Sequence, residues 1–478
     1  MVAYVSSTKE RHSPLPVVLF ILAAAALYGF AAFSFIDLID RHESEIETAI
    51  EDLNEYMPVI EDALPFIGLF VAILFILSLL LSYGLLKLMR HTAATVTVVI
   101  AFIVPIIFIL IGVVLIATVV LAFVGLMLIL VGLLLLGLAY WGRQRLRRAG
   151  KFLEFSAHLA LDEKAILGAP VLMAIFSVIS LFAMGISFLE IYDLWGVYVE
   201  TDQYGRSSTE LDTVGAIIAM LIEYCFLILY FGIYYVLSGF VVSYAYDWYR
   251  DEIDPDIKTA WRDVKPVIAI ILGFAVIRAT IQMLLRFLRR MTTSEARAGR
   301  GGVALFFAIS YIVSAFAASI FRFFTYFALP AIVIKKKGLR QSIKDSADLV
   351  WENWLQVLIG DIGLGLALLI FAIANGVSWA VLGIALGYFI LQTYEWAIIM
   401  GVIFLIFSFV AFTMIRMPLS VAFSTFLYAY ALDRREGFKK PSRLPQELRD
   451  EFNARMDHYH RYYATRTTRG GIPNPRGY

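Results

Sequence analysis

The sequence contains little charge. Only 17% of its 478 residues are charged, whereas an average soluble domain has about 25%. No Asp, Glu, Lys, Arg or His occurs between Thr92 and Gly142, a stretch more than twice as long as the roughly 20 residues that one membrane-spanning helix needs. This stretch therefore predicts two crossings, with a tight turn near Gly125 or earlier, and excludes a soluble globular fold.

Cysteine and the common catalytic motifs are also scarce. The single cysteine, Cys225, excludes an internal disulfide, a Cys-rich zinc site and an iron–sulfur cluster. The chain has no phosphate-binding Gly-rich loop with Lys-Ser/Thr, no H-E-x-x-H pair and no G-x-S-x-G turn. We therefore expect no enzyme, no catalytic residues, no metal site and no cofactor.

The long apolar blocks predict an all-α, polytopic integral membrane protein with about ten transmembrane helices. Region 1–151 is expected to hold four of them, the first two at Leu15–Ile36 and Pro65–Leu86. Residues 37–64 carry ten acids and one arginine with apolar residues at helical spacing, which predicts an external amphipathic helix.

Orientation follows from the basic residues in short loops, which favour the cytoplasmic side. Lys9 and Arg11 precede the first span, and the basic sequence RQRLRRAGK follows the fourth. These positions predict a multi-pass protein of the cell membrane with both termini cytoplasmic.

Residues 152–432 are expected to form six further helices in three weakly similar units. Each unit begins with a cytoplasmic amphipathic segment, called an elbow here, and continues as an outward and an inward span. The elbows are predicted at Phe152–Lys164, Asp254–Lys265 and Leu339–Trp354. Repeats of this kind are common in membrane folds.

Two parts of this region leave alternatives open. Leu355–Ile390 is too long for one straight span, and Asn375 with Gly376 could divide it into two crossings or a span with a re-entrant piece. Residues 266–302 could cross the membrane or lie at its surface. Residues 433–478 are predicted to form a cytoplasmic basic tail, for which anionic lipid headgroups are a simpler partner than nucleic acid.

Several charges lie inside apolar spans, where a charged side chain usually faces protein or water and has a partner. Glu223, Arg278 and Arg322 are all expected roughly 15–20 Å from a membrane face, so they predict an ion-pair cluster near the midplane. Asp361 and Arg416 are further candidates. These charges could form a substrate or proton site, or a buried polar pin between helices.

A polar stripe also runs along one predicted helix, at Arg278, Gln282, Arg286 and Arg289. The stripe could line a water-filled path or lie at the membrane interface.

A basic group follows the apolar run that ends at Ile334. Lys335, Lys336, Lys337 and Arg340 are predicted to lie at headgroup level, where each is worth roughly 1 kcal/mol against anionic lipid. The elbow after them is expected to turn an apolar face to the membrane, at Ile343, Ala347, Val350, Trp351 and Trp354.

The stretch FALPAIVIKKKGLRQSIKDSADLVWENW carries a resemblance to known families. Phe327, Pro330, Gly338, Ser346 and a following tryptophan resemble a pattern in uncharacterised polytopic membrane proteins of prokaryotes. The pattern is similar to the membrane domain beside some bacterial glycerophosphodiester phosphodiesterases, over residues 234–435. The catalytic domain of those enzymes is absent here, so the resemblance implies a fold and no phosphodiesterase activity.

A second segment, RQRLRRAGKFLEFSAHLALDEKAILGAPV, is similar to part of the choline-transporter-like proteins. The function predicted from all these features is a transporter or lipid-handling protein. The alternative is a structural or assembly subunit of a membrane complex. The expected partners are membrane lipids, together with other subunits or a homo-oligomer.

Overall fold

The computed structural model describes residues 14–42, 86–99, 101–116, 122–199, 208–211, 213–250, 255–297, 301–391 and 394–436, with a few isolated positions besides. The predicted second span, most of the acidic helix 37–64 and nearly all of the tail 433–478 lie outside these residues.

The described residues are helical, with one exception. Strand β1 (Gly196–Val199) pairs antiparallel with β2 (Ser208–Leu211), with Gly196 opposite Leu211. This hairpin joins α4 to α5, so the all-α expectation needs this one correction. The other elements are α1 (Leu15–Arg41), α3 (Ala122–Asp162), α4 (Gly168–Trp195), α5 (Thr213–Arg250), α6 (Ile257–Val264), α7 (Ile268–Arg297), α8 (Gly301–Phe324), α9 (Ala328–Lys335), α10 (Leu339–Glu352), α11 (Trp354–Leu391) and α12 (Tyr394–Glu436), with short 3-10 turns at Lys164–Leu167 and Lys265–Val267.

Six helical stretches of the described residues are long and apolar enough to cross a membrane, by length and composition. The pair Leu86–Val99 and Ala101–Ile116, bent by 41°, raises this number to seven if it forms one broken span. The expected count of ten spans is therefore not confirmed. The six are Leu15–Arg41, Gly125–Gln144, Lys164–Trp195, Val214–Arg250, Ile257–Thr292 and Leu305–Lys335.

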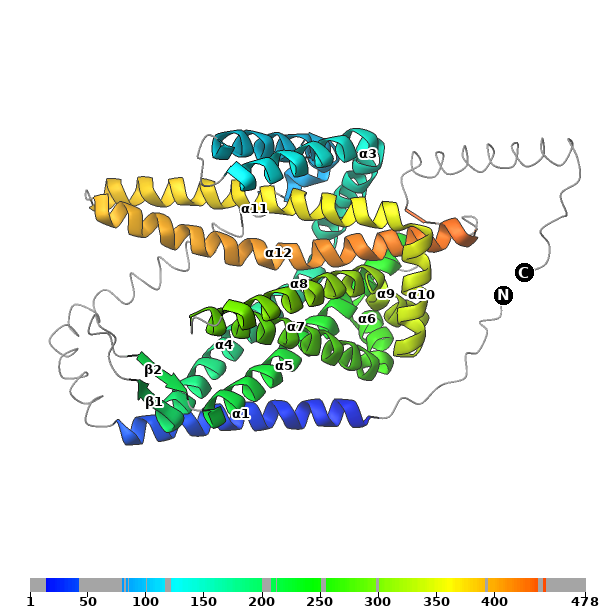
Figure 1. Ribbon diagram of the computed structural model, residues 1–478. Helices are drawn as coiled ribbons and strands as arrows, with labels where there is room; N and C mark the ends of the chain where they lie inside the picture. The colour runs from blue at the N-terminus through cyan, green and yellow to red at the C-terminus, as the bar shows by residue number, and fades with distance from the viewer. Residues whose placement is uncertain are drawn as a thin grey trace, which may run out of the picture.

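Helices α11 and α12 form a long antiparallel pair (Figure 1). Helix α11 continues without a break through Asn375 and Gly376. The buried Asn375 side chain instead donates to Ser408 Oγ at 2.6 Å, across the contact with α12. A Cβ on Gly383 would lie 2.7 Å from the Met400 carbonyl oxygen, so glycine permits the close approach of the two helices.

The first predicted elbow is not a separate element. Phe152–Asp162 continues α3 as one helix of 41 residues, which packs on α11 and α12. A Cβ on Gly150 would lie 2.3 Å from Ala94 Cα, so the backbones of α3 and Leu86–Val99 touch here. The prediction that residues 152–164 are helical is confirmed as far as Asp162. The spacing of their apolar residues gave no sign that they continue the preceding helix.

At the second and third elbow positions the structure has short helices, α6 and α10. Helix α10 begins at Leu339, the residue at which the third elbow was predicted to start. Ser342, Ser346, Leu349 and Val350 pack inward, so Val350, which was predicted to lie on the face toward the membrane, belongs to the core instead. Trp351 is 70% exposed, which suits an aromatic residue of the membrane interface.

The chain turns between α8 and α9 at Thr325–Phe327. Pro330 has no amide hydrogen to donate to the Tyr326 carbonyl, so a continuous helix would lose a bond at this point. Ser346 of α10 joins the turn instead, accepting from the Phe327 amide at 3.0 Å and donating to the Phe324 carbonyl at 2.7 Å.

The main core lies where α6, α9 and α10 meet the ends of α3, α5 and α12. Its largest fully buried side chains include Phe327, Phe423, Phe426 and Tyr428. A buried ion pair joins α5 to α12, since Arg250 lies 2.7 Å from Asp433, and the Tyr249 hydroxyl donates to the same carboxylate at 2.8 Å.

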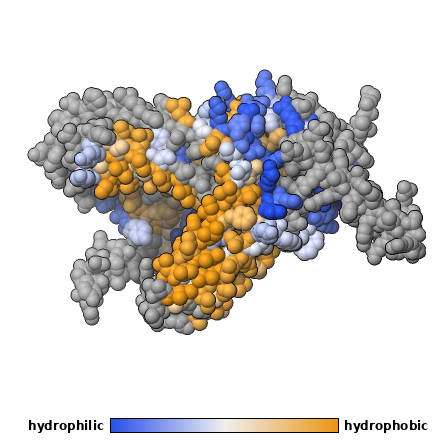
Figure 2. All heavy atoms as spheres, turned by 90° about the horizontal axis from the view of Figure 1, so that it is seen from above, coloured by the Kyte–Doolittle hydropathy of each residue, from blue (hydrophilic) through white to orange (hydrophobic). Residues whose placement is uncertain are grey.

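The helices α6, α9 and α10 gather at one end of the molecule, and the hairpin β1–β2 lies at the other (Figure 1). Helix α1 begins, and α12 ends, at the end that holds the three short helices. Seen from above, a broad hydrophobic surface covers much of the left and centre, while hydrophilic residues gather toward the right (Figure 2). This separation fits a membrane whose plane stands upright in the view, so that the helices cross it from left to right.

Candidate functional site

The charges predicted to cluster near the membrane midplane have separate partners. Glu223 of α5 accepts from Arg286 at 2.6 Å and lies 2.8 Å from Arg290, both on α7. Its side chain is only 6% exposed, so a buried carboxylate is held by two guanidinium groups. This arrangement pins α5 to α7.

Arg278 does not join this group. Its Nε donates to the Tyr235 hydroxyl at 3.0 Å, and Tyr235 stacks on Phe231 and packs against Phe274. The predicted cluster of Glu223, Arg278 and Arg322 is therefore wrong, because equal depth along three helices does not fix the direction in which each side chain points.

Two members of the polar stripe on α7 have partners on α5. Arg286 turns to Glu223, while Arg278 turns to Tyr235. Residues 257–292, which include this stripe, qualify as a membrane span. The sequence signal for the true partners of Glu223 was the spacing of Arg286 and Arg290, which places both on one helix face.

Arg322 and Asp361 meet between α8 and α11. Arg322 Nη2 donates to Asp361 Oδ2 at 3.4 Å, a long contact, and the two side chains are 63% and 35% exposed. Both charges open into a cavity of about 530 Å³. The lining residues are Ser319, Ile320, Arg322, Phe323, Phe324, Tyr326, Leu358 and Asp361.

Tyr326 lines this cavity with a buried polar group. Its hydroxyl oxygen is buried and makes no hydrogen bond to any described residue. A buried hydroxyl without a partner costs free energy, so the position suits a group that receives a ligand or water. Ser346 positions the turn that carries Tyr326, and Trp351 stacks on the neighbouring Phe324 at 6.4 Å.

The remaining midplane candidate, Arg416, is exposed on α12, two residues before Pro418. The structure thus brings Arg322 and Asp361 together, and leaves Glu223, Arg278 and Arg416 in other places.

The three lysines at the end of α9, Lys335 to Lys337, bind acidic residues of two short helices. Lys337 donates to Asp345 of α10 at 2.7 Å, and Lys335 lies 3.8 Å from the same carboxylate. Lys336 donates to Asp263 of α6 at 2.8 Å. Lys336 has φ 52°, the left-handed conformation that ends many helices, and its amide donates to the Ile332 carbonyl. These lysines join α6, α9 and α10, while Arg340 is exposed.

A further charge cluster lies at the opposite end of the bundle. Arg41, at the end of α1, contacts Asp37, Glu190 and Asp193. Glu190 is almost fully buried and lies 2.5 Å from the guanidinium group. The sequence showed Arg41 only as the one basic residue among many acids, and gave no sign that α4 supplies two of its partners. No group of three or more potential metal ligands occurs among the described residues.

A comparison with known protein families gives a match over most of the described helices. Residues 126–435 match the sequence profile of a family described as plasma-membrane choline transporter. The chain belongs to this family. The match spans well over half of the chain and includes Asp361, Tyr326 and the whole α8–α11 cavity.

Family membership supports the similarity to choline-transporter-like proteins read from residues 143–171, and a multi-pass protein of the plasma membrane. It is also consistent with a protein that is not an enzyme. The resemblance to the phosphodiesterase membrane domain, and to prokaryotic proteins in particular, stays a prediction. No curated protein matches the chain.

Proposed function

We propose that this protein transports a small organic cation of the choline type, and that the α8–α11 cavity is the place where the cation binds. The observation that carries this proposal is the meeting of Asp361 with aromatic side chains in one cavity. A quaternary ammonium group is attracted both by a carboxylate and by the faces of aromatic rings. The cavity offers Phe323, Phe324 and Tyr326 beside the carboxylate.

The depth of the charges supports a functional cavity. Asp361 lies seven residues into α11, about 10 Å along the helix. If α11 crosses the membrane, a partly exposed charge at this position is costly unless water or a ligand surrounds it. Glu223 is buried between two arginines and joins α5 to α7, which is a structural role. The Arg322–Asp361 pair instead lines a cavity.

Arg322 has a specific role in this proposal. Its contact with Asp361 is long and largely exposed, so it is weak. Arg322 serves as the tethered positive partner of Asp361 in the empty cavity, and an arriving cation replaces it. The carboxylate then has a positive partner in both states.

The proposed orientation places the end with α6, α9 and α10 in the cytoplasm. The basic residues Lys335–Lys337 lie at this end, where α1 also begins and α12 ends. An excess of Lys and Arg favours the cytoplasmic face. Both described chain ends are then cytoplasmic. Family membership favours transport over the structural-subunit hypothesis.

The test is uptake of labelled choline by the purified full chain in liposomes with a negative interior potential. We expect saturable uptake by the wild-type protein. Asp361→Asn should lower the apparent affinity on the order of tenfold or more, a factor equal to about 1.4 kcal/mol. Asp348→Asn, which removes an exposed carboxylate of α10, is the matched control and should transport normally.

A second substitution separates a transport site from a structural pin. Arg322→Gln removes the tethered competitor, so choline should bind at least as well as in the wild type. If Arg322→Gln and Asp361→Asn instead lose uptake equally, together with thermal stability, the pair is a structural pin and the proposed site is wrong. If the wild-type protein takes up no choline, the proposed substrate class is wrong.

A further inference from the structure

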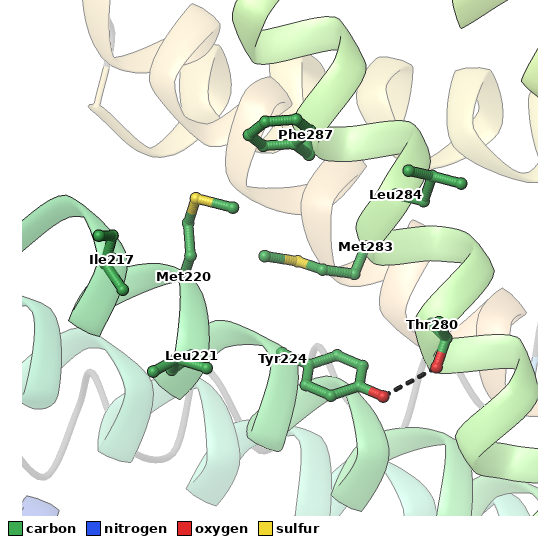
Figure 3. A pocket seen from close by; sticks show the side chains of 8 residues that line it. All are labelled: Ile217, Met220, Leu221, Tyr224, Thr280, Met283, Leu284 and Phe287. Carbon is green, nitrogen blue, oxygen red and sulfur yellow. Dashed lines mark hydrogen bonds between the residues drawn. The ribbon is translucent and has the colours of Figure 1, made fainter.

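A second hollow lies between α5 and α7, away from the cavity described above (Figure 3). Its volume is about 550 Å³, within the range of roughly 300–1,000 Å³ found for small-ligand sites. In the close-up, Met220 and Met283 extend toward one another across it, and Phe287 closes its upper edge. The complete lining is Ile217, Met220, Leu221, Tyr224, Thr280, Met283, Leu284 and Phe287. We call this the α5–α7 groove.

The polar groups of the groove are already satisfied. The Tyr224 hydroxyl and Thr280 Oγ1 form a hydrogen bond of 2.8 Å, drawn in Figure 3. Thr280 Oγ1 also donates to the Val276 carbonyl at 2.9 Å. Because these hydroxyls bond to one another and to the backbone, the ligand that fits the groove is apolar.

The groove opens sideways, toward the surroundings of the helices. Ile217, Leu221 and Leu284 are each at least half exposed. All the lining residues lie within the candidate spans Val214–Arg250 and Ile257–Thr292. What meets this opening in a membrane protein is the hydrocarbon of the bilayer. The two methionines are flexible and can adapt to an irregular chain.

One end of the groove lies next to an arginine of α7. Along α7 the lining residues Thr280, Met283 and Phe287 recur at helical spacing, and Arg290 continues that row one turn further. Arg290 is 56% exposed and lies two residues before the end of the candidate span at Thr292, the end of this helix at which a phosphate group of the bilayer is expected. Glu223 contacts both Arg286 and Arg290, and the Arg290 side chain stays largely exposed beside that contact.

We propose that the α5–α7 groove binds one acyl chain of a phospholipid whose phosphate is held by Arg290. The acyl chain then runs from Phe287 past the two methionines to Tyr224 and Thr280, about 10 Å along α7. Arginine is well suited to phosphate, because its guanidinium group donates two parallel hydrogen bonds. This site is independent of the proposed transport of a cation.

The experiment uses the full chain in liposomes that contain phosphatidylglycerol with a photoreactive diazirine midway along one acyl chain. After irradiation, the labelled peptides are identified by mass spectrometry. We expect adducts concentrated on residues 217–224 and 280–287. Inorganic phosphate at millimolar concentration should not reduce them, because the acyl chain contributes to binding and free phosphate has none.

Substitutions test the two parts of the site separately. Met220→Trp with Met283→Trp fills the groove and should lower these adducts on the order of tenfold. Ile312→Trp, on the exposed face of α8, adds the same bulk elsewhere and should leave them unchanged. Arg290→Gln should lower them for phosphatidylglycerol while Arg143→Gln, at an exposed arginine of α3, should not.

Several outcomes would overturn the proposal. Adducts spread evenly over the exposed faces of α1 and α8 would indicate ordinary lipid contact. Adducts that persist in the filled double variant would place the lipid elsewhere. Adducts absent from both peptides in the wild type would mean that another segment of this chain, or a second copy, covers the groove. The Arg290→Gln variant keeps the Glu223–Arg286 contact between α5 and α7 and adds no bulk to the groove, so it remains informative if the double variant does not fold.

Discussion

Helices α8 and α9 are consecutive and both strongly apolar, yet they face different surroundings. Six of the eight residues of α9 are buried in the core. In α8 the large apolar side chains are mostly exposed, among them Leu305, Phe306, Ile312, Val313 and Phe316. The apolar residues of α9 therefore stabilise the fold through packing, whereas those of α8 match a lipid environment. Apolar composition alone does not separate these two roles.

The largest effect on stability is expected from a substitution in the buried core next to α9. Phe327, the residue immediately before α9, is fully buried, and its ring centroid lies 5.7 Å from that of Tyr428 of α12. Phe327→Ala should destabilise the protein by about 3–5 kcal/mol, since it leaves a cavity in the core. Phe316→Ala, the same change on the exposed face of α8, should stay within about 0.5 kcal/mol. Unfolding in detergent measures both, and equal losses would contradict the difference between the two helices.

A smaller effect is expected at the turn between the two helices. Ser346→Ala removes the acceptor of the Phe327 amide and the donor to the Phe324 carbonyl. Leaving buried groups without partners should cost about 1–3 kcal/mol. Ser177, which only bonds the preceding turn of its own helix α4, is the control, and Ser177→Ala should change the unfolding temperature little. A Ser346→Ala protein as stable as the control would show that Ser346 does not hold the turn.

The third prediction concerns the continuation of α3. His158 accepts from Arg90 Nε at 3.2 Å. Burial, and then the charge of Arg90, hold the pKa of His158 below its usual 6.5. The folded protein therefore keeps this imidazole neutral, while the unfolded chain takes up a proton as the pH falls below about 6.5. Stability should be constant above this pH and should fall below it.

The His158→Gln variant isolates that contribution, because glutamine can still accept from Arg90 and does not titrate. Unfolding temperatures of both proteins at pH 7.5 and pH 5.5 provide the measurement. The wild type should lose more stability on acidification than the variant. An equal loss in both would assign the pH dependence to other groups.

Much of the architecture was predictable because it depends on local pattern. The start of α10 at Leu339 and the long apolar spans follow from composition and helical spacing. The continuous α3 and α11 were not predictable in the same way. Asn375 and Gly376 are helix-weakening residues, but a hydrogen bond from the partner helix gives Asn375 a place within α11.

The site was predictable only in part, for a geometric reason. Counting residues gives the depth of a charge along a helix, but not the direction of its side chain around the helix axis. Glu223, Arg278 and Arg322 were expected at the same depth, yet they point to different neighbours. Asp361 was recognised as a charge inside an apolar span, yet its pairing with Arg322 depends on how α8 and α11 approach each other.

The claim that Asp361 forms a cation site is tested most directly by equilibrium binding to the purified protein. Calorimetry should compare choline with its neutral isostere, in which a carbon atom replaces the quaternary nitrogen. The account predicts that the wild type binds choline and not the isostere, and that Asp361→Asn loses this preference while remaining folded. Equal choline affinity in the wild type and in Asp361→Asn would contradict it.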